Sequence, residues 1–366
     1  MHIGFDAKRA FFNVTGLGNY SRSLLLALFQ HFPQHDYHLF SPKTPKQLFQ
    51  EGCTFPNVQL HTSSSSLFSA YWRTFQIGKQ LEQHKIDIYH GLSHELPFDI
   101  QKAKHTRKIV TIHDLIFLRY PQDFPWIDRQ MYSQKFRFAC KNADTIVAIS
   151  SQSKADIVHY FGTNPDKIAV IPPVMREDFT LSSGIPTDFP SEILHTPYIL
   201  YVGAQSSRKN VISLLKALPF LPTSLKIVLV GRGHEQKNLQ QYLAQHHLQA
   251  RVLFLTNVND AMLPFLYQQA KCVVYPSVFE GFGLPIVEAL QCGVPVITGE
   301  NACFVEAGGD GILYVNQKNP EEIANAILQL LDNKALAKSL VEKGQAHIQQ
   351  FRAENVAKRL MEIYLE

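Results

Sequence analysis

Residues Pro276–Thr298 read PSVFEGFGLPIVEALQCGVPVIT, and this stretch indicates how the second half of the chain folds. The apolar run Cys272–Tyr275 precedes it and is typical of a buried strand. Pro285 suits the first position of a helix, which we expect over Ile286–Gln291 with an end near Gly293. A strand, a glycine turn and a helix in this order predict one unit of a parallel α/β sheet.

Two carboxylates lie on either side of this turn, Glu280 after the strand and Glu288 in the helix. The N–H groups at a helix start favour phosphate, and carboxylate oxygens accept hydrogen bonds from the vicinal hydroxyls of a ribose or a hexose. We interpret the stretch as a sugar-nucleotide site, with Glu288 on the ribose diol and Glu280 on the transferred sugar. The loop residues expected to hold the diphosphate are Gly281, Phe282, Gly283 and Leu284. The alternative is an ordinary strand–turn–helix, because a glutamate in a first helical turn is favourable by itself.

Short apolar runs and helical patterns alternate through both halves of the chain, which predicts an α/β fold with two Rossmann-like domains. A long helix is expected over Asn19–Phe32, and the proline-rich passage Ile171–Pro197 is the expected linker. A final amphipathic helix is expected over Ala346–Leu365. The predicted strands are His2–Phe5, Tyr37–Ser41, Ile88–His90, Ile109–His113, Thr145–Ile149, Tyr198–Val202, Lys226–Val230, Val252–Phe254, Cys272–Tyr275 and Pro295–Thr298.

Composition narrows the class of protein. The chain has 366 residues and 45% hydrophobic residues, enough for two packed cores. Its five cysteines form no C-x-x-C pair, and no signal-peptide pattern or 18-residue apolar run occurs, so we expect a cytoplasmic protein with reduced thiols. The first 180 residues carry 20 Lys and Arg against 15 Asp and Glu. This balance fits a phosphate-bearing partner, an anionic membrane or a merely solvated surface.

Several segments, in order, resemble those of one enzyme family. E-G-F-G-L-P-I-V-E resembles the E-x7-E signature of retaining GT-B glycosyltransferases of family 4, also called group 1. The other matching segments are Thr15–Tyr20, Val110–Leu115, Ala148–Ser151 and Tyr201–Asn210. The resemblance implies two Rossmann-like domains facing across a cleft. It implies acceptor binding by residues 1–175, nucleotide-sugar binding by 176–345, and a last helix, 346–366, that returns to the first domain.

The resemblance also implies roles for individual residues. Arg208 and Lys209 would stabilise the charge that develops on the leaving diphosphate, although Ala204 stands where some members carry an arginine. His113 would bind the donor sugar, with Asp114 in a structural role.

For some further residues we expect either a ligand contact or an ordinary structural role. The backbone at Gly16 and Gly18 would approach the diphosphate, or form an ordinary strand–helix turn. Val258 would lie near the nucleobase, and either His90 or His94 could contact the acceptor. No Asp-x-Asp motif occurs. The resemblance implies that cations and helix dipoles take the place of a metal ion, so we expect neither a metal ion nor another cofactor.

The resemblance implies a retaining hexosyltransferase for a glycan or lipid-linked glycan acceptor, of the kind that builds bacterial surface polysaccharides such as lipopolysaccharide. GDP-mannose is the first donor to test, followed by UDP-glucose or a UDP-N-acetylhexosamine. An NAD-type oxidoreductase and a non-catalytic sugar-nucleotide-binding protein are the other classes considered, and no nucleic-acid partner is expected. Aromatic residues in Ser69–Phe75, with the cation Arg73, and basic residues in Lys102–Lys108 suggest peripheral contact with an anionic membrane.

Overall fold

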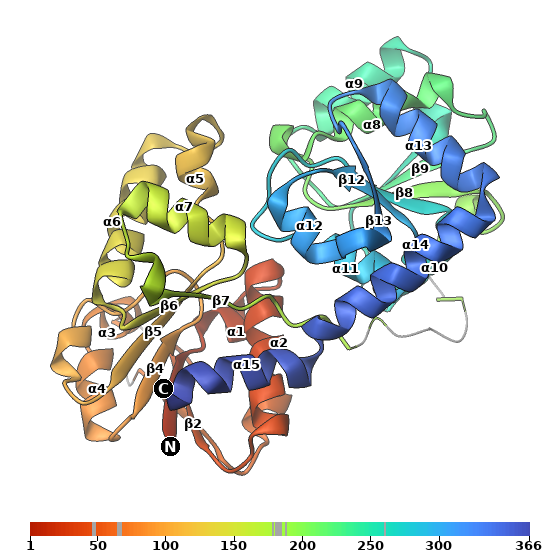
Figure 1. The fold of residues 1–366 in the computed structure, drawn as a ribbon. Coiled ribbons are helices and arrows are strands. Elements are labelled where there is room, and N and C mark those ends of the chain that lie inside the picture. The colour runs from red at the N-terminus through yellow and green to blue at the C-terminus, as the bar shows by residue number, and fades with distance from the viewer. Residues whose placement is uncertain (46–48, 64–67, 178, 180–184, 187–188, 260) are drawn as a thin grey trace. The chain divides into compact units, whose positions relative to one another are not determined.

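The structure is a computed structural model that describes residues 1–45, 49–63, 68–177, 179, 185–186, 189–259 and 261–366. The chain divides into two compact units (Figure 1). Unit 1 consists of Met1–Val174 together with Phe351–Glu366, and unit 2 consists of Met175–Gln350. The expected linker, Ile171–Pro197, includes residues 178, 180–184 and 187–188, which lie outside the described residues.

Unit 1 is built on a parallel sheet with the strand order β3-β2-β1-β4-β5-β6-β7. Its strands have three to six residues, and every paired neighbour runs in the same direction. They are β1 (His2–Asp6), β2 (Asp36–Ser41), β3 (Val58–Thr62), β4 (Ile88–Gly91), β5 (Arg107–Ile112), β6 (Thr145–Ala148) and β7 (Ile168–Val170).

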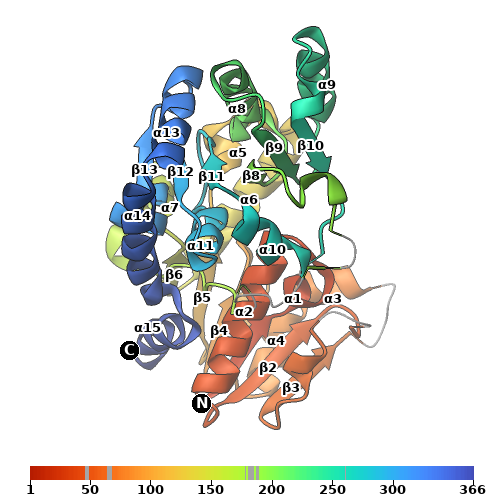
Figure 2. The ribbon, with the colours of Figure 1, turned by 90° about the vertical axis from the view of Figure 1, so that its right-hand side faces the viewer.

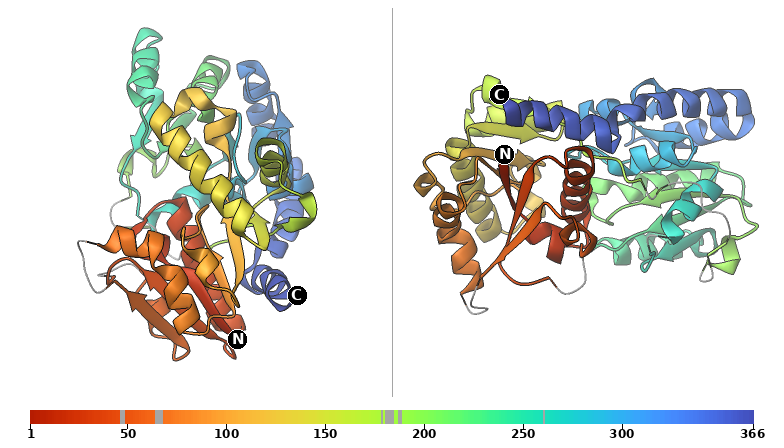
Figure 3. Two further views of the ribbon diagram at one scale, coloured as in Figure 1. Left: turned by 90° about the vertical axis from the view of Figure 1, so that its left-hand side faces the viewer. Right: turned by 90° about the horizontal axis from the view of Figure 1, so that it is seen from below.

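Helices cover both faces of this sheet, as parallel sheets require. On one face α2 (Gly16–His31) packs beside α15 (Ala353–Leu365), and Tyr364 of α15 bonds to His90 of β4. The two chain ends lie near each other in this unit (Figures 2 and 3). The remaining helices of the unit are α1 (Lys8–Phe12), α3 (Ser69–Phe75), α4 (Ile77–Gln83), α5 (Ile116–Arg119), α6 (Trp126–Asn142) and α7 (Ser151–Phe161). Buried side chains of α3, α4, α6 and α7 share one apolar core with Phe40 and Tyr89.

Unit 2 repeats this plan with the strand order β10-β9-β8-β11-β12-β13. The strands are β8 (Tyr198–Val202), β9 (Lys226–Val230), β10 (Val252–Leu255), β11 (Cys272–Tyr275), β12 (Val296–Gly299) and β13 (Ile312–Val315). The helices are α8 (Val211–Ala217), α9 (Gln236–Gln245), α10 (Met262–Gln269), α11 (Leu284–Gln291), α12 (Ala302–Gly308), α13 (Pro320–Asp332) and α14 (Lys334–His347). Helix α8 packs beside α13, and α10 beside α11 (Figure 2).

The predicted α/β class and the two parallel sheets are confirmed, and each predicted strand is present with small changes at its ends. Three strands were not predicted: β3, β7 and β13. The single helix expected over Ala346–Leu365 is wrong, because α14 ends at His347 and α15 begins at Ala353. The break follows from packing, since α14 buries its apolar side in unit 2 and α15 buries its own in unit 1.

Candidate active site

Two loops of unit 2 meet at the carboxyl edge of its sheet. Strands β8 and β11 are paired neighbours, yet the chain continues from β8 to β9 on one side and from β11 to β12 on the other. Ligands of open parallel sheets bind at such a reversal of strand order. The loop with Arg208 and Lys209 follows β8, and the loop with Glu280 follows β11, so the structure brings these three predicted residues together.

Glu280 forms a buried ionic cluster with both cations. Its Oε1 atom lies 2.5 Å from the Lys209 amine and 2.9 Å from a guanidinium nitrogen of Arg208. Ser277 donates a hydrogen bond of 2.6 Å to the same oxygen. Burial by itself would raise the pKa of Glu280, but the charges of Lys209 and Arg208 outweigh it and lower the pKa. The side chain is therefore a carboxylate at neutral pH.

Hydrogen bonds between the two loops fix the cations in position. Lys209 also donates to the Tyr275 hydroxyl at 2.8 Å, and Arg208 donates to the Phe279 carbonyl. Asn210 adopts a left-handed conformation, with φ of 53°, and begins α8. Its amide donates to the Pro276 carbonyl at 3.2 Å. The charged groups are thus held before any ligand arrives, as electrostatic catalysis requires.

The glycine turn after Glu280 leads directly into α11. Gly283 is the N-cap residue, at φ of 118°, and Leu284 is the first helical residue. Pro285 occupies the second helical position instead of the predicted first. Gly281 and Phe282 are buried in the turn. Among the described residues no side-chain hydrogen bond caps this helix start.

Glu288 and Val258 lie at the edges of this arrangement. Glu288 is half-buried on α11, and one of its oxygens accepts a hydrogen bond of 2.8 Å from Tyr267 of α10. It is thus anchored by α10, whereas Glu280 is anchored by the β8 loop. Val258 is half-buried in the loop after β10, two strands from the reversal.

The sequence reasoning missed three residues of this edge. Gly231, at φ of 120°, follows β9, and a β-carbon there would lie 2.3 Å from the carbonyl oxygen of Gly203. A β-carbon at Gly233 would lie 1.9 Å from the carbonyl oxygen of Gln205. The Gln205 side chain is fully buried, and its Oε1 has no hydrogen-bond partner among the described residues. Gly231 and Gly233 could have been found from the sequence, because they form a G-R-G motif directly after the predicted strand Lys226–Val230.

In unit 1 the predicted turn at Gly16 and Gly18 is part of the helix itself. Helix α2 begins at Gly16, three residues earlier than predicted, with Thr15 as its N-cap. The Asn13 side chain accepts hydrogen bonds from the backbone N–H groups of Thr15 and Gly18. A β-carbon at Gly18 would lie 1.8 Å from the Asn13 carbonyl oxygen, whereas Gly16 faces open space. The close approach at Gly18 is therefore to the protein's own backbone.

His113 is buried just beyond the end of β5. Its Nε2–H donates to the Leu92 carbonyl at 2.9 Å, and its ring packs edge-on against Tyr20. Burial lowers the pKa of His113 to about 4, so the ring is neutral at pH 7. The other nitrogen, Nδ1, is then a hydrogen-bond acceptor. Asp114 accepts a bond from the Ile116 N–H, which fits its predicted structural role.

His90 and His94 have different surroundings. His90 has no exposed surface, and both of its ring nitrogens are bonded, to Tyr364 at 2.6 Å and Thr111 at 2.8 Å. It is a core residue, and acceptor contact by His90 does not fit this structure. His94 has a strained φ of 65° and lines a pocket at the carboxyl edge of unit 1.

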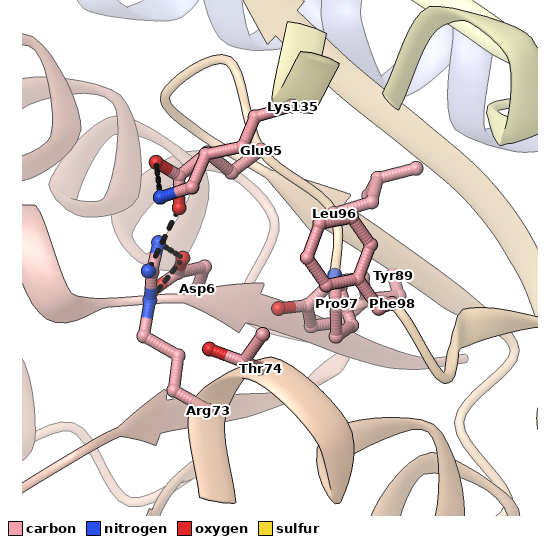
Figure 4. A pocket seen from close by; sticks show the side chains of 9 residues that line it. All are labelled: Asp6, Arg73, Thr74, Tyr89, Glu95, Leu96, Pro97, Phe98 and Lys135. Atoms are coloured by element: carbon pink, nitrogen blue, oxygen red, sulfur yellow. Dashed lines mark hydrogen bonds and ion pairs between the residues drawn. The ribbon is translucent and has the colours of Figure 1, made fainter. Parts of the chain in front are cut away.

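An ionic network occupies the reversal of strand order in unit 1, between β1 and β4 (Figure 4). Arg73 of α3 lies 2.5 Å from a carboxylate oxygen of Asp6 and 2.8 Å from one of Glu95. Lys135 of α6 contacts the other oxygen of Glu95 at 3.2 Å. The sequence suggested Arg73 as the cation of a membrane-contacting segment, Ser69–Phe75, but its guanidinium is only 13% exposed and forms the centre of this internal network.

Comparisons with known proteins give the class of the fold. HepE from Anabaena, solved with UDP and glucose, matches with a TM-score of 0.74 over 99% of both chains at 20% identity. Sucrose-phosphate synthase from Thermosynechococcus elongatus matches with a TM-score of 0.78 over 100% of this chain and 98% of its own, at 21% identity. The two parallel sheets therefore have the GT-B fold.

Sequence comparison gives the family. Residues 14–178 match the model described as Glycosyltransferase Family 4, and residues 188–347 match that of Glycosyl transferases group 1. The chain belongs to this family, as the sequence motifs predicted. O-antigen chain mannosyltransferase B of Escherichia coli is 28% identical over 100% of this chain and 99% of its own length. O-antigen chain mannosyltransferase RfbU of Salmonella typhimurium is 27% identical over 75% of this chain and 74% of its own.

The helices were also compared with the requirements for crossing a bilayer. In the part of the chain that the structure describes, none combines the necessary length with sufficient apolar character.

Proposed function

We propose that this glycosyltransferase moves a hexose, with retention of anomeric configuration, from a nucleoside diphosphate sugar to a glycan or lipid-linked glycan acceptor. The cluster of Glu280 with Arg208 and Lys209, at the strand reversal of unit 2, is the observation that carries the proposal. GDP-mannose is the first donor to test, since two relatives are named mannosyltransferases of O-antigen chains. UDP-glucose and UDP-N-acetylhexosamine are the alternatives, and HepE was solved with UDP and glucose.

The proposed chemistry uses the two cations at the leaving group. The bond between the sugar C1 and the β-phosphate oxygen breaks, and the acceptor oxygen bonds to C1 on the same face. The acceptor proton passes to the departing phosphate. Negative charge grows on the diphosphate as the bond breaks, so Lys209 and Arg208 stabilise the transition state more than the ground state. No metal ion is required in this scheme, because the cations and the start of α11 supply the positive potential.

The acidic residues bind hydroxyl groups in this proposal. Glu280 holds the transferred sugar beside the cations, and Glu288 holds the ribose diol. The backbone at Gly281–Leu284 contacts the diphosphate, and Val258 lies near the base. The roles of His113, Gly16 and Gly18 in donor binding stay predictions.

A thermal-shift panel of nucleoside diphosphates and their sugars tests the proposal. A ligand at 100 times its dissociation constant stabilises a protein by about 2.7 kcal/mol. We expect GDP to raise the melting temperature with or without EDTA, and GDP-mannose to be consumed when a glycan acceptor is added. Lys209→Ala should lower turnover by about 10²–10³-fold. No stabilisation by any nucleoside diphosphate would contradict the proposal.

We also propose peripheral docking of unit 1 on the anionic inner face of the cytoplasmic membrane. Tyr71, Phe75 and Phe98 are exposed and packed on one another, with ring centroids 5.2 and 5.7 Å apart. Lys102 and Lys104, a few residues after Phe98 in the chain, are exposed as well. Co-sedimentation with phosphatidylglycerol vesicles should fall as salt rises. A lack of co-sedimentation at low salt would contradict this part of the proposal.

A further inference from the structure

A pocket of about 230 Å³ lies at the carboxyl edge of the unit 1 sheet, separate from the cluster in unit 2. One wall is aromatic and comes from α5, α6 and the segment between them. The ring centroids of Phe117 and Phe136 lie 5.2 Å apart, and that of Tyr132 lies 5.7 Å from Phe117. Phe117 and Phe136 are buried, whereas Tyr132 and Phe124, which also line the pocket, are half-buried.

The polar side of the pocket presents a donor and an acceptor in fixed positions. The His94 ring stacks on Phe136 at 4.4 Å, and its Nδ1 accepts a hydrogen bond from the His113 backbone. Its proton is therefore on Nε2. Glu95 is held by Arg73 and Lys135 (Figure 4). Burial would raise the pKa of Glu95, but these two cations lower it, so Glu95 is an ionised acceptor.

The charges around the pocket disfavour a phosphate-bearing ligand. Among the described residues that line it, Arg9 is the only cation, and Asp114 and Glu95 are the anions. Arg73 and Lys135 belong to the neighbouring network and are already paired with carboxylates. Glu95 is in turn paired with these two cations, so the lining residue left to balance a phosphate of charge near −2 is Arg9, which the carboxylate of Asp114 opposes. Hydroxyl groups, by contrast, can donate to Glu95 and accept from His94 without any net charge to balance.

We propose that this pocket binds the neutral terminal pyranose of the acceptor, with its C–H face on Tyr132 and its hydroxyls on Glu95 and His94. The inference rests on the proposed function and narrows its acceptor to a glycan recognised through an uncharged sugar ring. A lipid diphosphate attached to that glycan would lie outside this pocket.

The test compares two probes on the full-length protein, methyl α-mannoside and mannose 1-phosphate, by calorimetry or saturation-transfer NMR. We expect the neutral glycoside to bind more tightly, with an affinity that salt does not change. Tyr132→Ala should weaken it about tenfold through loss of the aromatic contact. Tyr132→Phe, which keeps the ring, should recover most of that loss. Met131→Ala, an exposed position on the same helix, is the matched control.

Two outcomes would overturn the inference: unchanged glycoside binding in Tyr132→Ala, or tighter, salt-sensitive binding of mannose 1-phosphate that Arg9→Gln abolishes. The folding control for these unit 1 variants is the thermal unfolding of each protein without ligand, compared with that of Met131→Ala. Failure of the proposed function would instead appear as the absence of stabilisation by any nucleoside diphosphate. That result is independent of the glycoside titration.

Discussion

Replacing Glu280 by Gln removes one charge from the ionic cluster of unit 2 while keeping the shape of the side chain. The carboxylate lies 2.5 Å from Lys209 and 2.9 Å from Arg208, and all three side chains are less than 15% exposed. Removing one partner of a buried ion pair costs about 3–5 kcal/mol, because the remaining charge stays buried. For a unit of this size, 1 kcal/mol shifts the melting temperature by about 2–4 °C. We therefore expect a loss of about 6–20 °C for unit 2 without ligand.

The same substitution should strengthen the binding of bare GDP, since both cations lose their internal counter-ion. Transfer of sugar should nevertheless fall, because the proposed partner of the sugar hydroxyls is lost. Calorimetry with GDP, thermal unfolding and transfer rates measured on one preparation separate these effects. The exposed Glu300, at the same edge of the sheet, provides the control variant Glu300→Gln.

A double-mutant cycle distinguishes the ion pair from a general loss of packing. Lys209→Met combined with Glu280→Gln should be more stable than the sum of the two single effects predicts, because both charges of the Lys209–Glu280 pair are removed together and only Arg208 loses its counter-ion. The reasoning is refuted if Glu280→Gln melts within 2 °C of Glu300→Gln, or if the two single effects simply add.

Three further predictions concern other parts of the molecule. Glu288→Ala should weaken GDP binding by about 1.5–3 kcal/mol, the value of a charged hydrogen bond, and equal calorimetric affinities would remove the ribose assignment. Burial lowers the pKa values of His90 and His113 to about 3 and about 4 in the folded protein. As the pH falls, these two side chains therefore become protonated in the unfolded chain before they do so in the folded one. The free energy of unfolding should be lower at pH 5 than at pH 7.5 by about 2 kcal/mol per histidine, and this difference between the two pH values should be smaller in His90→Gln. Gly231→Ala should lower both stability and GDP affinity, because its new β-carbon would lie 2.3 Å from the Gly203 oxygen; unchanged melting would contradict the close approach.

The parts of the fold that sequence predicted are those in which a local pattern is strong. The buried strands next to each reversal, such as Cys272–Tyr275, are continuous apolar runs with clear turns after them. The missed strands lie toward the sheet edges, where partial burial weakens the pattern. Val58–Thr62 has no fully buried residue, and Ile168–Val170 is only three residues long.

In the candidate active site, too, only the features with a strong local sequence pattern could be predicted. Arg208, Lys209 and Glu280 were identified from two short motifs, but their mutual pairing depends on strand order, which neither motif contains. His90 illustrates the limit most clearly. Its partner Tyr364 lies 274 residues further along the chain, so nothing local distinguished a core histidine from one open to the acceptor.

The last helix also has a consequence for the order in which the protein can be completed. Unit 2 is continuous in the chain, whereas unit 1 requires Ala353–Leu365, which the ribosome makes only after all of unit 2. Until then the sheet face around His90 and Phe5 lacks the cover that Tyr364 provides. During synthesis, the half of the protein that emerges first is therefore finished last. Chains stopped early would expose this apolar face to chaperones and proteases.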